Sequence, residues 1–101
     1  MDNKEMKEHL DNIVNKLDIL SSNKSILFND NDIIQIKIII NNINKLFDEN
    51  NLLEIAKLYD ELNNYIYNIN LMNNQIPDTD YLMNQLYAFG YLLQDKIKTS
   101  N

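Results

Sequence analysis

His9 is the only histidine of the chain, and it lies beside the carboxylates of Glu5 and Glu8. A carboxylate–histidine metal centre in a helical bundle needs paired Glu-x-x-His motifs and further inward-facing carboxylates. The chain has no cysteine, so thiolate ligands are also missing. We interpret His9 as a surface helix residue and expect no metal and no other cofactor.

Other candidate binding and catalytic motifs lack residues that their chemistry requires. Residues 29–32 and 78–80 have the composition of calcium loops, but they lack the required Gly and Glu positions and match helix N-caps instead. The only glycine, Gly90, lies inside a predicted helix, so there is no phosphate-binding loop. The serines have no histidine in a triad arrangement. We therefore predict no catalytic residue and no enzyme activity.

Tyrosine is the remaining unusual feature, because all six tyrosines fall between residues 59 and 91. Tyr59 follows an apolar stripe and is expected in the core. Tyr67 lies off the main stripes, as do Tyr87 and Tyr91, which share one helix face at i, i+4 spacing. Exposed tyrosines suit a protein interface, although partial burial between two helices would explain them equally. The candidate partner-binding residues are Tyr65, Tyr67, Tyr87 and Tyr91.

Composition and charge narrow the class of protein. The 101 residues fit one domain, 1–101. The composition, with 45% hydrophobic and 24% charged residues, is typical of globular proteins. Nine lysines, no arginine and fifteen acidic residues give a net charge of -6, which disfavours direct nucleic-acid binding. We expect no secretory signal and no membrane span, because the N-terminus is polar and the longest run of aliphatic residues is 38–40. The predicted location is cytoplasmic.

Four amphipathic helices must position these residues, at about 3–21, 31–48, 51–72 and 79–98. The β-branched run at 32–40 also permits a strand, but no other segment alternates to pair with it. Asn51 and Glu54 resemble a capping box, and Gly90 indicates a close contact between helices. Residues 25–28 are expected to cover one end of the core, and residues 98–101 to fray. Short loops predict an all-α fold, an antiparallel up-down-up-down four-helix bundle.

The predicted core stripes follow the 3.6-residue period of a helix. They comprise Met6, Leu10, Ile13, Leu17 and Leu20; Ile33, Ile36, Ile40, Ile43 and Phe47; Leu52, Ile55, Tyr59, Leu62, Ile66 and Ile69; and Leu82, Leu86, Phe89, Leu93 and Ile97.

From Leu17 to Leu93 the chain resembles the enterocin A-type family of immunity proteins for pediocin-like bacteriocins. The resemblance lies in LNNYIY at 62–67, Ile76-Pro77 before a polar helix start, and LMNQLYAFG at 82–90. It implies a cytoplasmic antiparallel four-helix bundle that protects its producer at the inner membrane face. The implied partner is the membrane receptor–bacteriocin complex, and the C-terminal half is the region associated with specificity. The acidic pI of about 4.5 differs from many members and disfavours docking beside an anionic bilayer.

Two other functions remain open. The first is a phage-encoded, anti-CRISPR-like inhibitor that binds a host defence complex through an acidic, tyrosine-rich surface. The second is a self-associating helical module, in which the apolar residues outside the stripes would seal a dimer. Those residues are Ile19, Ile34, Ile38, Leu71 and Leu92. The expected oligomeric state is a monomer or a weak dimer.

Overall fold

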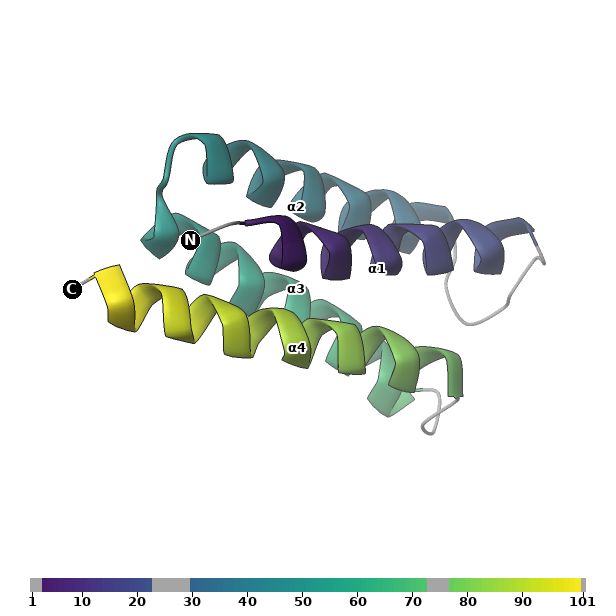
Figure 1. Ribbon diagram of the computed structural model, residues 1–101. Helices are drawn as coiled ribbons and strands as arrows, with labels where there is room; N and C mark the ends of the chain where they lie inside the picture. Colours follow the sequence, from purple (N-terminus) through teal and green to yellow (C-terminus); the bar gives the residue numbers. More distant parts are fainter. Residues whose placement is uncertain (1–2, 23–29, 73–76, 101) are drawn as a thin grey trace.

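Four antiparallel helices form the protein in the computed structural model, which describes residues 3–22, 30–72 and 77–100. They are α1 (Lys4–Ser22), α2 (Asp30–Asp48), α3 (Leu52–Met72) and α4 (Pro77–Ser100). Consecutive helices run in opposite directions, so the start of α1 and the end of α4 lie at the same end of the bundle (Figure 1). The predicted all-α four-helix bundle is therefore confirmed.

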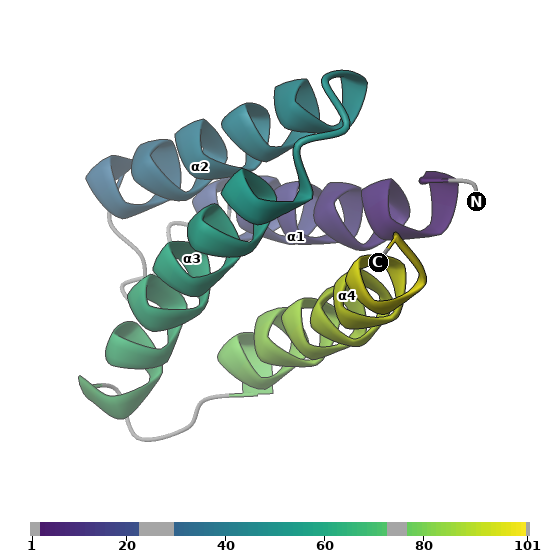
Figure 2. The same cartoon turned by 90° about the vertical axis from the view of Figure 1, so that its left-hand side faces the viewer.

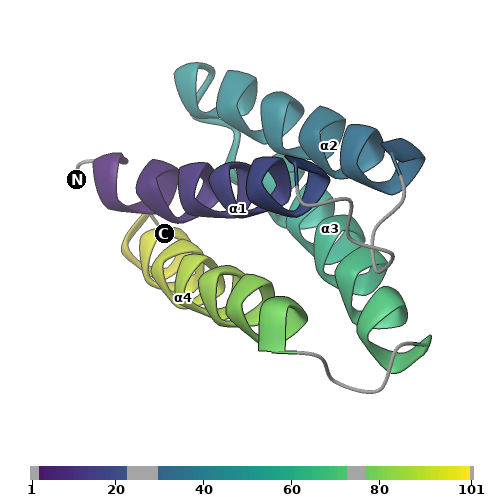
Figure 3. The same cartoon turned by 90° about the vertical axis from the view of Figure 1, so that its right-hand side faces the viewer.

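Each helix packs against two neighbours. Helices α1 and α3 both contact α2 and α4, whereas the diagonal pairs α1–α3 and α2–α4 make no close backbone approach within the described ranges. Figures 2 and 3 show α3 and α4 inclined relative to α1 and α2. The molecule measures 42 × 22 × 19 Å along its principal axes. Within the part of the chain described, no helix combines the length and apolar character that crossing a bilayer requires.

The core forms where the four apolar stripes meet. Every stripe residue predicted in α1 and α2 is buried, and Ile39 joins them. In α3 and α4 the inner stripe residues are buried, while Leu52, Tyr59, Ile69 and Ile97 pack against the core at its margin. Burying these side chains stabilises the fold because each removes apolar surface from water.

Residues 32–40 are helical, so the strand alternative is excluded. On a helix, Ile33, Ile36 and Ile40 point into the core together, and their burial outweighs the modest cost of β-branched side chains in a helix. The same geometry leaves Ile34 and Ile38 about half exposed.

Residues 49–51 join α2 to α3, and the last two of them are asparagines. Asn50 has a left-handed backbone with φ of 55°, and its N–H donates to Phe47 O at 3.2 Å. The N–H of Asn51 donates to Leu46 O, also at 3.2 Å, which completes a Schellman motif with Asn at the position that glycine usually takes. Asn51 then caps α3, because its Oδ1 accepts from the Glu54 N–H at 3.4 Å. The predicted cap at Asn51 is confirmed.

Helix α4 is longer than the sequence predicted. It begins at Pro77 rather than at residue 79, because proline needs no N–H partner in the first turn of a helix. It continues to Ser100, so the predicted fraying of residues 98–100 is wrong. Thr99 Oγ1 donates to Lys96 O at 3.1 Å, and the buried Lys96 ammonium donates to Asn3 Oδ1, which ties this end to the start of α1. The predicted cover at residues 25–28 lies outside the described residues.

Candidate functional site

Gly90 allows the phenol ring of Tyr59 to lie directly against the backbone of α4. A Cβ atom at position 90 would stand 2.8 Å from Tyr59 Cζ and closer still to the hydroxyl, which is shorter than a normal carbon contact. The Tyr59 ring stacks on Phe89 with centroids 5.8 Å apart, and Phe89 meets Phe47 edge-on at 6.2 Å. The predicted close helix contact at Gly90 is confirmed, and Tyr59 is the side chain that makes it.

A groove of about 330 Å³ opens beside this contact, between α3 and α4. We call it the tyrosine groove. Its lining residues are Ala56, Tyr59 and Asp60 of α3, and Tyr87, Gly90, Tyr91, Leu93, Gln94 and Ile97 of α4. Tyr87 and Tyr91 keep 47% and 72% of their surface exposed, so both phenols are accessible to a partner. Two of the four predicted partner-binding residues therefore share one surface.

The tyrosine groove has an acidic character. Burial raises the pKa of Tyr59, and the nearby Asp60 carboxylate and the phenols of Tyr87 and Tyr91 raise it further. Asp60 is exposed and forms no hydrogen bond or ion pair with any residue that the structure describes. None of the described residues that line the groove is basic. The carboxylate is therefore available to a cationic ligand.

Tyr65 lies on the other side of α3, where its hydroxyl donates a hydrogen bond of 2.7 Å to Asp32 Oδ1 on α2. Burial, this hydrogen bond and the charge of Asp32 together raise the pKa of Tyr65 to about 12. The hydroxyl is thus engaged in holding α2 against α3. The structure does not bring Tyr65 together with Tyr87 and Tyr91.

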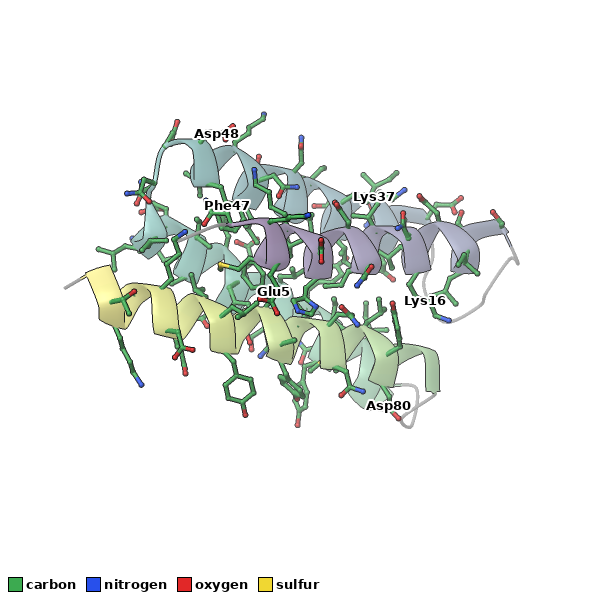
Figure 4. All side chains as sticks on the ribbon, in the orientation of Figure 1. Glu5, Lys16, Lys37, Phe47, Asp48 and Asp80 are labelled. Carbon is green, nitrogen blue, oxygen red and sulfur yellow. The ribbon has the colours of Figure 1, made fainter. Side chains whose placement is uncertain are left out.

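Tyr67 is 45% exposed and lies two helical turns beyond Asp60, on the same flank of α3. It does not line the tyrosine groove. The sixth tyrosine, Tyr81, is 40% exposed, and its ring lies 5.6 Å from the ammonium of Lys16. Figure 4 shows Lys16 of α1 extending toward α4.

His9 is half-buried rather than on the surface, as the sequence had suggested. Its Nδ1 lies 2.8 Å from Gln85 Oε1, which also accepts from Asn12 Nδ2 at 3.1 Å. This network joins α1 to α4. Helical periodicity gave no indication that His9 would contact Gln85. Across the described ranges, no three histidine, aspartate or glutamate side chains gather closely enough to hold a metal ion.

A second groove, of about 420 Å³, lies on the outer face of α1 and α2. We call it the isoleucine groove. Its lining residues are Val14, Ile34, Lys37, Ile38, Ile40, Asn41 and Asn44. Lys37 forms an ion pair with Asp18 of α1, so its charge is already compensated. Asn44 Oδ1 is buried there without a hydrogen-bond partner among the described residues.

Sequence periodicity missed two members of the tyrosine groove. Tyr59 was expected in the core, although it lies at the margin with its phenol toward α4, and Asp60 was not among the candidate binding residues. One signal was available. Gly90, which marks a close approach, lies on α4 between Tyr87 and Tyr91 in the sequence.

Comparison of the chain with protein-family models, curated proteins and solved structures finds no match.

Proposed function

We propose that the chain is a non-enzymatic cytoplasmic immunity protein that protects its producer against a pediocin-like bacteriocin. It acts by binding the receptor–bacteriocin complex at the inner membrane face, and Tyr87 and Tyr91 of α4 form the centre of the contact. The supporting observation is the exposed pair of phenols beside the tyrosine groove. The antiparallel bundle is also the fold that the resemblance implies.

Exposed tyrosines favour binding for a physical reason. A phenol ring offers a large contact area, yet it loses few rotatable bonds when a partner immobilises it. Aromatic residues with a polar tip are accordingly frequent among the residues that dominate binding energy. Tyr91 leaves 72% of its surface to solvent, so much of that area remains for a partner to bury.

Protection from killing is the direct test. A bacteriocin-sensitive lactic acid bacterium that expresses the chain is exposed to a panel of pediocin-like bacteriocins, and survival is compared with that of the empty-vector strain. We expect protection against one or a few of them. The double variant Tyr87→Ala/Tyr91→Ala should abolish it while circular dichroism and the melting temperature remain near wild type.

Tyr81→Ala is the matched control, because Tyr81 is an exposed tyrosine of α4 that does not line the tyrosine groove. It should leave protection intact. Full protection by the double variant would exclude this surface as the contact, and killing by every bacteriocin, with the protein folded and present, would count against immunity. Tyr67→Ala measures whether the contact extends along α3.

Inhibition of a host defence complex is the second candidate function, and the net charge of -6 favours it. An acidic surface is attracted to the positively charged nucleic-acid channel of a nuclease complex. Tight binding to such a complex that weakens as salt rises would support this alternative, because salt screens exposed charges. Absence of binding at low salt would remove it.

A further inference from the structure

The tyrosine groove combines aromatic faces with acceptors for hydrogen bonds. Its lining includes Tyr59 of α3 and both Tyr87 and Tyr91 of α4, and the Tyr59 ring lies against the backbone at Gly90. The hydroxyl of Tyr59 and the carboxylate of Asp60 both border the same space and have no hydrogen-bond partner among the described residues. A ligand that fills the groove therefore meets ring faces and oxygen acceptors together.

Charge restricts the ligand further. Among the described residues of the lining, Asp60 alone has an ionised side chain, so an anion would be repelled and a cation attracted. Cations are also attracted to the faces of aromatic rings. The volume of about 330 Å³ is at the low end of the range for ligand pockets, which fits one side chain better than a large ligand.

We propose that the tyrosine groove binds an arginine side chain that projects from the surface of the partner protein. A guanidinium is planar, so it stacks on a phenol ring, and its five N–H donors match the carboxylate of Asp60 and the hydroxyl of Tyr59. A lysine ammonium is more strongly hydrated and cannot stack. This inference rests on the proposed function, because it names the chemistry of the partner at the same surface.

The arginine must come from a different protein. This chain has nine lysines and no arginine, so a second copy cannot supply the guanidinium. The tyrosine groove is thereby distinguished from a surface for self-association.

Titration with Nα-acetyl-arginine methylamide, followed by ¹⁵N and ¹³C NMR of the full chain, tests the proposal. Gly90 is the only glycine of the sequence and lines the groove, so its amide signal is an unambiguous reporter. We expect saturable shifts of this amide and of the Tyr59, Tyr87 and Tyr91 rings in the millimolar range. The citrulline analogue, which has the same shape without the charge, should bind at least several-fold more weakly.

Two pairs of variants assign the contacts. Asp60→Asn should weaken binding about three- to fivefold, whereas Asp11→Asn, an equal change of net charge on exposed α1 surface, should not. Tyr91→Leu should weaken it about two- to fivefold through loss of the ring face, whereas Tyr67→Leu, outside the groove, should leave it unchanged.

Three outcomes would overturn the proposal: no saturable shift up to about 50 mM ligand, shifts centred outside the tyrosine groove, or equal binding of the citrulline analogue. The protection assay separates this inference from the proposed function. If Tyr87→Ala/Tyr91→Ala loses protection but Asp60→Asn keeps all of it, the contact surface is correct and the arginine is not. If arginine binds selectively but the chain protects against no bacteriocin, the proposed function fails and the chemistry of the groove stands.

Discussion

The tyrosine groove and the isoleucine groove are similar in size, at about 330 and 420 Å³, but they differ in chemistry. In the isoleucine groove the one charged residue, Lys37, is paired within the fold with Asp18, and the remaining lining is aliphatic or amide. In the tyrosine groove the charged residue, Asp60, has no such partner within the described ranges. Of these two grooves, as lined by the described residues, the tyrosine groove is the one that offers an unpaired charge for directional recognition.

The difference follows from how the helices pack. At Gly90, the Tyr59 ring lies against α4. Beside this contact, the tyrosine rings of α3 and α4 line the open tyrosine groove. Helix α2 has more isoleucines than its inner face can bury, so Ile34 and Ile38 remain about half exposed. The tyrosine groove therefore depends on the packing of α3 against α4, whereas the isoleucine groove is mainly a property of α2.

The largest expected effect is the loss of stability when Phe89, the buried ring that stacks on Tyr59, is removed. Phe89 is fully buried and contacts both Tyr59 and Phe47, so Phe89→Ala should reduce the free energy of unfolding by about 3–5 kcal/mol. Urea denaturation followed by circular dichroism measures this. Leu53→Ala, at a position 72% exposed, should change it by less than about 0.5 kcal/mol. Similar losses for both variants would contradict the assigned core.

The next effect tests the contact that shapes the groove. Gly90→Ala should destabilise the protein by about 1–2 kcal/mol, because the new Cβ displaces the Tyr59 ring from α4. In a Tyr59→Leu background the clash disappears, and the better helix propensity of alanine should make the same change stabilising by up to about 1 kcal/mol. A double-mutant cycle in urea measures the coupling. Additive effects would mean that Tyr59 does not lie on Gly90.

Tyr65 should behave differently from the groove tyrosines, because its hydroxyl holds two helices together. Its pKa is raised to about 12, above the ordinary value of 10.0, so the folded state binds this proton more tightly than the unfolded state does. The resulting stabilisation is fully present below pH 10 and is lost as pH rises toward 12. Tyr65→Phe should cost about 0.5–1.5 kcal/mol at pH 7. It should also flatten the decline of the urea midpoint between pH 10 and 12.

The smallest effect concerns the isoleucine groove. Ile34 is 53% exposed, so Ile34→Gln should cost only about 0.5 kcal/mol and should change neither protection nor arginine binding. The survival assay and the NMR titration check this. Loss of protection by a folded Ile34→Gln variant would place the partner contact at the isoleucine groove of α1 and α2 instead of the tyrosine groove.

The sequence by itself determined the four helices and most of the core. Spacings of three and four residues allow only a helix to bury Met6 through Leu20, or Ile33 through Phe47, along one face, and the packed structure keeps those faces inward. The cap at Asn51 was equally local, because it depends on residues three positions apart. Both features depend on distances along the chain.

Only the tertiary structure decided which tyrosines belong together. Tyr65 and Tyr67 are two residues apart, yet one is held by Asp32 on α2 and the other faces solvent. Tyr59 and Asp60 reach Tyr87 and Tyr91 across a helix interface, and His9 reaches Gln85 across another. These contacts join residues far apart in the sequence, and their geometry depends on how far α3 and α4 incline and approach. Helical periodicity gives the face that a side chain occupies, whereas packing against the neighbouring helix decides what it meets there.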